Sequence, residues 1–248
     1  MNVFKQIAQL INQSEQTVIL TGAGISTESG LPDFRSDDGF WTKNKPIQFS
    51  EFIASEEKRR LSWERNIELH SLLEDLNPNL GHECVKKIID SRQENFLITQ
   101  NIDGLHQKTG TPINKTIEIH GNATEASCLD CGTKQEILHF HAAIKNKTQL
   151  PRCSSCKGIV KVATISFGQP MIDADMAKAS KLSMECSLMI VIGSSLKVMP
   201  AGKLPGLAIE AGAKVIIFNR EKTRYDSKAE IVVNDELKTI CSKLLLEL

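Results

Sequence analysis

The feature that most constrains this chain of 248 residues is a set of short, almost wholly apolar segments, each followed by glycine or polar residues. They occupy residues 18–20, 96–98, 188–192, 214–218 and 231–233, and a β-rich run of similar length lies at 116–119. Strands that are buried on both faces have this composition, whereas strands with one face in water alternate apolar and polar residues. Because helical patterns fill much of the intervals, the sequence predicts an α/β fold with a doubly wound parallel sheet.

The turn after the first of these segments has the composition of a phosphate-binding turn. Gly22 and Gly24 allow the backbone to turn sharply and to approach a ligand closely. Ser26 and Thr27 can cap a following helix, whose N-terminal amides would face an anion. The next glycine is Gly30, whereas the usual dinucleotide fingerprint places its third glycine three residues after the second. The glycines alone therefore leave an ordinary tight turn open as the alternative.

Polar side chains gather after several of the predicted strands. An acid, an aromatic residue and a base follow the first turn at Asp33, Phe34 and Arg35. Ligands of open α/β sheets bind at the carboxyl ends of the strands, so we expect the polar residues there to meet in one crevice. A histidine at a strand end, His120, is a candidate general base because its ordinary pKa lies near neutrality, and a purely structural histidine stays open as the alternative.

Two Cys-x-x-Cys pairs indicate a metal site. The four residues are Cys128, Cys131, Cys153 and Cys156. Each pair can hold one edge of a tetrahedral ion, so the two pairs together predict one structural zinc ion, with redox-active thiols as the alternative. Four thiolate ligands leave no open coordination position for catalysis.

The positions of these motifs suggest a division of the chain. We expect a zinc-ribbon module over residues 125–163, inserted into a Rossmann-like domain formed by 1–124 and 164–248. A helical and cofactor-loop insertion is expected at about 36–80, and a strand at 165–170 that leaves the zinc module.

Composition excludes several classes of function. The formal net charge is +0, which gives no basis for non-specific attraction to nucleic acid or to a membrane. No apolar run approaches the length of a membrane span, and the first residues lack the apolar core of a signal peptide. Seven cysteines without a secretory signal favour thiols or metal ligands over disulfides, so we expect a cytoplasmic protein without direct nucleic-acid or membrane partners.

Taken together, these stretches resemble the sirtuins, a family of NAD-dependent protein-lysine deacylases. The motifs occur in the family's order from about Ile19 to about Asp235, and the short termini resemble those of minimal bacterial members. They are Thr-Gly-Ala-Gly-Ile-Ser at 21–26, Gly-Leu-Pro-Asp-Phe-Arg at 30–35, Thr-Gln-Asn-Ile-Asp at 99–103, His120-Gly121, the two cysteine pairs, Phe167-Gly168 and Gly-Ser-Ser-Leu at 193–196.

The resemblance implies roles for individual residues around NAD. The diphosphate would be held by Gly22, Ala23, Gly24, Ser26, Thr27 and Arg35, and the adenosine half by Gly193, Ser194, Ser195, Asn219, Arg220 and Asp235. The nicotinamide pocket would be lined by Phe34, Ile102 and Asp103, and the nicotinamide ribose would be oriented by Gln100 and Asn101. His120 would be the general base, with Asn101 as a second catalytic residue.

The resemblance also implies the substrates and products. Acetyl-lysine proteins or peptides would enter a tunnel walled by Phe34, His120, Ile165 and Phe167, and the reaction would release nicotinamide, lysine and O-acetyl-ADP-ribose. The substrate backbone would add as a strand between residues 167–169 and the segment after Ser195.

Two departures from the family's pattern lie toward the expected peptide cleft. Gln169 stands where most relatives carry glutamate, and Lys161-Val162 stands near the position of an Arg-Pro pair. Peptide preference is therefore left open, as are the oligomeric state and the physiological acyl group. The Tyr-x-x-Arg pair of relatives that remove dicarboxylic acyl groups is missing from residues 62–69, so we expect a preference for neutral acyl groups.

Other activities remain as alternatives at this point. Some relatives catalyse mono-ADP-ribosyl transfer or NAD hydrolysis, and others remove longer acyl groups. A dehydrogenase is disfavoured by the glycine spacing and the cysteine pairs, and a zinc-bearing module without turnover is disfavoured by the polar strand ends.

Overall fold

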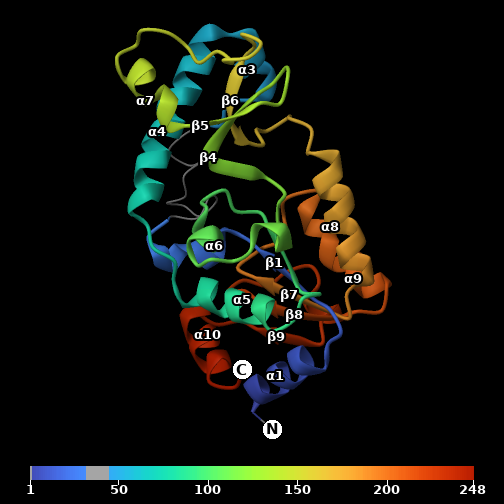
Figure 1. Ribbon diagram of the computed structural model, residues 1–248. Coiled ribbons are helices and arrows are strands. Elements are labelled where there is room, and N and C mark those ends of the chain that lie inside the picture. The colour runs from blue at the N-terminus through green and yellow to red at the C-terminus, as the bar shows by residue number, and fades with distance from the viewer. Residues whose placement is uncertain (1, 32–44) are drawn as a thin grey trace.

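The computed structural model describes residues 2–31 and 45–248. Its centre is a six-stranded parallel sheet with the spatial order β3-β2-β1-β7-β8-β9 (Figure 1). The strands are β1 (Thr17–Thr21), β2 (Phe96–Thr99), β3 (Thr116–Glu118), β7 (Leu188–Ile192), β8 (Lys214–Phe218) and β9 (Ile231–Val233). Strand order reverses beside β1, whose two neighbours are β2 and β7, and such a reversal opens a crevice at the carboxyl ends of the strands.

Helices cover both faces of this sheet because each strand is apolar on both sides. Ile19 and Ile190 face one helical layer, formed by α1 (Val3–Gln13), α5 (Leu80–Asp90) and α10 (Leu237–Leu245). Leu20 and Val191, the next residues along, face the layer formed by α8 (Asp173–Glu185) and α9 (Leu204–Glu210). Successive side chains of a strand point to opposite faces, so an uninterrupted apolar run builds two cores at once. The predicted fold class is confirmed.

A second, antiparallel sheet has the order β5-β4-β6. It consists of β4 (Gly121–Cys128), β5 (Lys134–Glu136) and β6 (Val160–Thr164), with α7 (Leu138–Lys145) beside it. Its apolar face packs against α3 (Phe49–Ala54) and α4 (Glu56–Asp75) through Phe52 and Trp63. The Trp63 indole donates a hydrogen bond to the Val160 carbonyl at 3.2 Å, which satisfies a polar group inside this core.

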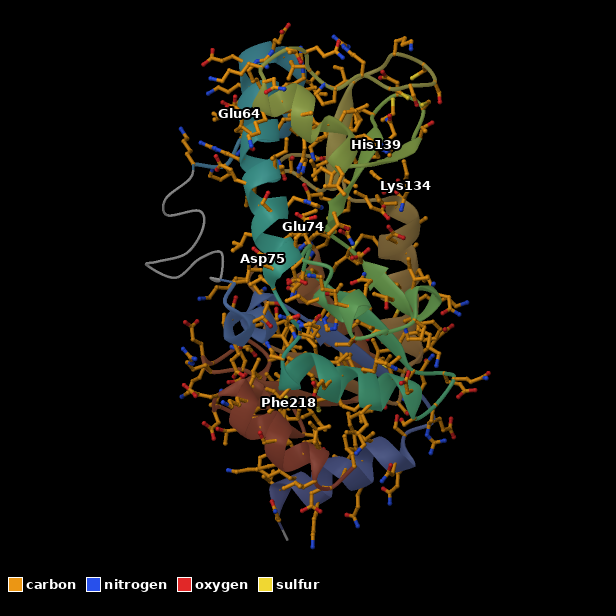
Figure 2. The ribbon with its side chains drawn as sticks, turned by 60° about the vertical axis from the view of Figure 1, so that its left-hand side comes forward. Glu64, Glu74, Asp75, Lys134, His139 and Phe218 are labelled. Atoms are coloured by element: carbon orange, nitrogen blue, oxygen red, sulfur yellow. The ribbon has the colours of Figure 1, made fainter. Side chains whose placement is uncertain are left out.

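The long helix α4 connects the two sheets. Figure 2 shows Glu64 in the part of α4 beside the small sheet, and Glu74 and Asp75 at the end nearer the large sheet, where Phe218 lies. Lys134 of β5 and His139 of the neighbouring α7 lie in the same half of the molecule in this view. The helix therefore packs against the small sheet through Trp63 and against the segment after β1 through Leu73, which contacts Leu31.

The predicted strand at 165–170 is wrong. β6 ends at Thr164, and the chain then makes a turn in which the Gln169 amide donates to the Ser166 carbonyl at 2.9 Å. The Gln169 side-chain oxygen accepts from the Ser166 amide at 3.1 Å. These two hydrogen bonds use backbone groups of Ser166 and Gln169 that a strand would have offered to a neighbouring strand.

The remaining elements are short. They are the helix α6 (Leu105–Lys108) and the 3-10 helices η1 (Ala23–Ser29), η2 (Ile113–Lys115), η3 (Ala201–Lys203) and η4 (Asp226–Lys228). Among the helices of the described residues, none combines the length and the apolar composition needed to cross a membrane.

Candidate functional site

A cavity of about 680 Å³ lies at the carboxyl ends of the central strands. The residues that follow β1, β2, β7, β8 and β9 all contribute to its wall. Of the residues predicted from the sequence, those that line it are Gly22, Ala23, Gly24, Thr27, Gln100, Asn101, Ile102, His120, Ile165, Phe167, Gly193, Ser194, Ser195, Asn219, Arg220 and Asp235. Parallel strands end on the same side of a sheet, and this brings together residues that are far apart in sequence.

Of four other predicted residues, two lie behind the wall and two lie outside the described part of the chain. Ser26 and Asp103 are buried behind the cavity wall instead of lining it. Phe34 and Arg35 lie outside the described residues.

The floor of the cavity is formed where the backbone after β1 passes close to the backbone at the end of β7. The Gly22 amide donates to the Ile192 carbonyl at 3.1 Å, and the Gly24 amide donates to the Gly193 carbonyl at 2.9 Å. A Cβ added to Gly24 would lie 2.9 Å from the Cα of Gly193, and one added to Gly193 would lie 2.5 Å from the Ile25 nitrogen. Gly193 also has a φ of 63°, so both its conformation and its surroundings require glycine. The backbone is therefore exposed to any ligand that lies across this floor.

Ser26 is the centre of a buried hydrogen-bond network behind the cavity. Its hydroxyl donates to a carboxylate oxygen of Asp103 at 2.7 Å and accepts from the Asn101 side-chain amide at 3.1 Å. The other Asp103 oxygen accepts from the Leu105 amide at 2.9 Å. Burial raises the pKa of Asp103, and the hydrogen bonds from Leu105 and Ser26 oppose that rise. The network fixes the orientation of Asn101, which does reach the cavity.

Gln100 ties two strand ends together at the cavity wall. Its backbone amide donates to the Thr21 carbonyl at 3.0 Å, and its side-chain amide donates to the Ser194 hydroxyl at 2.8 Å. The Gln100 side chain is therefore held between the ends of β1 and β7. The backbone carbonyl of Gln100 accepts a hydrogen bond from His120.

The His120 imidazole lies at the cavity wall and is held through one of its ring nitrogens. Its Nδ1 lies 2.9 Å from the Gln100 carbonyl oxygen. A carbonyl can only accept, so Nδ1 carries the proton and Nε2 keeps its lone pair. Burial lowers the pKa of His120, and the hydrogen bond to Gln100 partly offsets the effect. The imidazole is thus neutral, and oriented, at neutral pH.

A second wall of the cavity comes from α4 and from the turn after β6. The cavity is also lined by Ser62, Arg65, Asn66 and Leu69 of α4 and by residues 164–169. Sequence reasoning did not assign Ser62, Asn66 or Leu69 to the site. Their spacing places them on one stripe of the helix, but α4 carries polar residues on all sides, so the stripe had no distinguishing composition.

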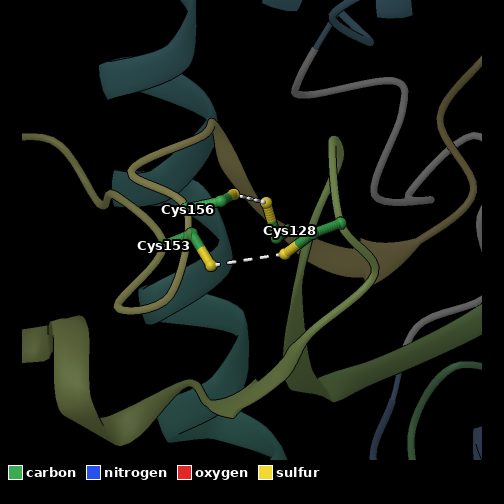
Figure 3. A group of neighbouring side chains, drawn as sticks. Cys128, Cys153 and Cys156 are labelled. Atoms are coloured by element: carbon green, nitrogen blue, oxygen red, sulfur yellow. Dashed lines mark hydrogen bonds between the residues drawn. The ribbon is translucent and has the colours of Figure 1, made fainter.

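The four predicted cysteines come together at one end of the small sheet. Their Sγ atoms all lie within 4.8 Å of one another. Figure 3 shows Cys153 and Cys156 on one loop and Cys128 on the facing loop, with Cys128 and Cys156 sulfurs 3.5 Å apart. A tetrahedral zinc ion with Zn–S bonds of about 2.3 Å needs sulfurs about 3.8 Å apart, so the four thiols fit such an ion.

Comparisons with known proteins agree with one another. The family model described as the Sir2 family matches residues 22–200. A relative named NAD-dependent protein deacetylase, from Rhodopseudomonas palustris, is 40% identical over 233 residues, which cover 94% of this chain and 92% of that protein. Another, NAD-dependent protein deacetylase 1 of Bradyrhizobium diazoefficiens, is 41% identical over 233 residues, covering 94% and 91%.

Solved structures are similar over the whole length of the chain. One described as "Sir2-p53 peptide-NAD+" has a TM-score of 0.82 and 33% identity, and the match covers 98% of both chains. One described as "Structure of Sir2Tm bound to a propionylated peptide" has a TM-score of 0.84 and 32% identity, covering 100% of this chain and 98% of that one.

The glycine at the strand crossing is open to a direct test of stability. Gly193→Ala should lower the free energy of unfolding by the roughly 1–2 kcal/mol of a left-handed alanine plus about 1–3 kcal/mol for the collision with residues 24–25. Gly212→Ala is the matched control, because Gly212 has a φ of 92° but nothing within 4 Å of an added Cβ. Urea denaturation of both variants measures the difference. Equal losses would show that the crossing tolerates a methyl group.

Proposed function

Because the chain belongs to the Sir2 family, we infer that it is an NAD-dependent protein-lysine deacetylase. The observation that carries this function is the meeting of the glycine floor, the oriented amides of Gln100 and Asn101, and the neutral imidazole of His120 in one cavity. NAD supplies the ribose that accepts the acetyl group, and nicotinamide, lysine and O-acetyl-ADP-ribose are released.

The floor of the cavity suits a dinucleotide diphosphate. Side chains are absent at Gly22, Gly24 and Gly193, so a ligand can lie directly against the backbone there. We assign the diphosphate to residues 22–24, Ser26 and Thr27, and the adenosine half to residues 193–195, Asn219, Arg220 and Asp235. Ser26 would act from behind the wall, through Asn101 and Asp103, since it is fully buried.

The other end of the cavity suits nicotinamide and acetyl-lysine. We assign the nicotinamide pocket to Ile102, which lines the cavity, and to Asp103, whose buried carboxylate would have to come to the wall to accept from the carboxamide as well as from Ser26. Ile165 and Phe167 would wall the acyl-lysine tunnel beside His120. An apolar tunnel excludes water from the developing positive charge, and His120 Nε2 would remove a proton from a ribose hydroxyl.

The small sheet would be held together by one structural zinc ion. It would occupy the cluster of Cys128, Cys131, Cys153 and Cys156, in a module over residues 125–163. A unit of this size buries too little apolar surface to be stable by itself, and the metal would supply the missing free energy.

One assay tests the proposed function directly. The protein is incubated with NAD and an acetylated peptide, and mass spectrometry follows nicotinamide, the free lysine peptide and O-acetyl-ADP-ribose. Equal amounts of the three products are expected. Nicotinamide without deacetylated peptide would indicate NAD hydrolysis, and ADP-ribosylated protein would indicate ADP-ribosyl transfer.

The role of His120 predicts both a mutant phenotype and a pH dependence. His120→Ala should keep the fold and lower deacetylation by the ~10²–10⁴-fold typical of a lost general base. A base must be unprotonated to act, and burial lowers the pKa of His120, so activity should extend to more acidic pH than an ordinary histidine would allow. The acidic limb of kcat/KM is therefore expected below pH 6.5, the ordinary pKa.

His139→Ala is the matched control, because the His139 side chain is 66% exposed and lies on the small sheet's side of the molecule (Figure 2). It should leave the rate unchanged. Near-normal turnover of His120→Ala would remove His120 from the mechanism.

The metal assignment predicts one zinc ion per chain by elemental analysis. Cys128→Ser should lose the ion and unfold or aggregate the small sheet, since the metal is the main constraint on its loops. Cys186→Ala removes a buried thiol outside the cluster and should keep the zinc content. A folded, metal-free and active Cys128→Ser protein would contradict a structural zinc ion.

The α4 wall predicts the choice of acyl group. Arg65 is the cation that α4 contributes to the cavity, and its Nη1 already donates to the Lys45 carbonyl at 2.8 Å. Among the described residues of α4, an acyl carboxylate could be paired only by drawing Arg65 away from that carbonyl, and an unpaired carboxylate would carry a desolvation penalty of several kcal/mol. Acetyl-lysine should therefore be cleaved at least about tenfold more efficiently than succinyl-lysine on the same peptide.

Kinetic measurements on the two peptides decide the point, with Arg65→Gln as the comparison. The acetyl-to-succinyl ratio should be unchanged in that variant. Equal efficiency on the succinyl peptide, lost on replacing Arg65, would show that this guanidinium reaches the acyl group.

A further inference from the structure

Lys161 is a buried lysine without a carboxylate partner among the described residues. It lies in β6, paired with Ser127 of β4, and only 3% of its surface is exposed. Burial lowers the pKa of Lys161 to about 8, so the ammonium still carries its charge at neutral pH. Removing an ammonium from water is costly, and buried lysines are rare unless another group stabilises them.

The Lys161 ammonium is hydrogen-bonded to backbone carbonyls at the end of its own strand. Nζ donates to the Thr164 carbonyl at 2.6 Å and to the Val162 carbonyl at 3.2 Å. The face of the Phe52 ring lies beneath the same ammonium, 6.0 Å from Nζ to the ring centroid. The Lys161 side chain therefore extends along β6 and binds the carbonyl of the last residue of the strand, Thr164.

The carbonyl that Lys161 holds is next to the proposed general base. Thr164 pairs with Gly121, and the Ile165 amide donates to the His120 carbonyl at 2.8 Å. Thr164 and Ile165 also line the cavity beside His120. A shift of the Thr164 peptide would therefore move the wall of the tunnel.

The other contact of Lys161 leads to the same segment. Phe52 belongs to α3, and the first residue of α3, Phe49, donates its amide to the Phe167 carbonyl at 2.9 Å. Residues 164–169 are thus held from two sides, by the ammonium at Thr164 and by α3 at Phe167. The two contacts are linked, because the Lys161 ammonium lies over the ring of Phe52, which belongs to α3.

We propose that Lys161 is a positioning residue for the acetyl-lysine peptide: through the Thr164 carbonyl and Phe52 it fixes the segment 164–169 against which the substrate binds. This inference rests on the proposed deacetylase function. An apolar residue would fill the same space at lower cost of burial, but it would leave the Thr164 carbonyl without its donor.

Steady-state kinetics with NAD and an acetylated peptide separate this role from a general loss of stability. Lys161→Met keeps most of the volume and removes the donor. We expect the KM for the peptide to rise about tenfold, as for one lost charge-assisted hydrogen bond, with the KM for NAD and kcat changed less than about threefold. Lys161→Arg should restore the peptide KM to within about threefold of wild type, because a guanidinium can donate to both carbonyls.

Lys115→Met is the matched control. Lys115 also donates to two backbone carbonyls, those of Ile89 and Arg92, but neither of those residues lines the cavity, whereas Thr164 does. It should leave the peptide KM unchanged even where it lowers the melting temperature. If Lys161→Met does not fold, Lys161→Gln replaces it, with the same expected rise in peptide KM because the shorter amide does not reach the Thr164 carbonyl.

The outcomes are distinguishable. An unchanged peptide KM in the Lys161 variant, with active wild type, would overturn the positioning role alone, as would an equal rise in the Lys115 variant. Failure of the wild-type protein to deacetylate any acetylated peptide would instead overturn the proposed function on which the inference rests.

Discussion

The crossing of two backbone segments at the ends of β1 and β7 is the constraint on which the rest of the site depends. Gly24 and Gly193 lie so close that a methyl group on either would collide with the other segment. The hydrogen bonds between these segments extend the parallel ladder past the ends of the strands. The cavity floor is consequently made of rigid backbone, and the groups around it inherit their positions from the sheet.

Behind that floor, the site depends on buried polar groups that satisfy one another. Ser26 links Asn101 to Asp103, and the carboxylate is also bound by a backbone amide. In a low-dielectric surrounding such a network is stabilising only when each member has a partner, and this requirement leaves few alternative orientations. The side chain of Asn101 therefore reaches the cavity already oriented, as does His120 through the Gln100 carbonyl.

Much of this arrangement follows from local sequence. Uninterrupted apolar runs such as Leu188–Ile192 require burial on both faces, and a parallel sheet between helices is the common solution. The carboxyl ends of parallel strands meet at one edge, so polar residues after the strands predict a shared cavity, and residues from Gly22 to Asp235 do line one. Two pairs of cysteines, each with two residues between its members, likewise favour a common centre, and the four thiols converge.

Other features were decided only by tertiary structure. Ser26 and Asp103 differ from their polar neighbours in lying behind the wall, because the turn of η1 directs Ser26 inward, which no spacing of residues specifies. The segment 165–170 has a strand-like composition but forms a turn, since its hydrogen-bonding groups find partners in Gln169 and α3. The contribution of α4 to the cavity and the burial of Lys161 against Phe52 depend on how the small sheet packs on α3 and α4. Sequence patterns report which residues must be buried or paired, whereas the choice of partner depends on contacts between segments that are distant along the chain.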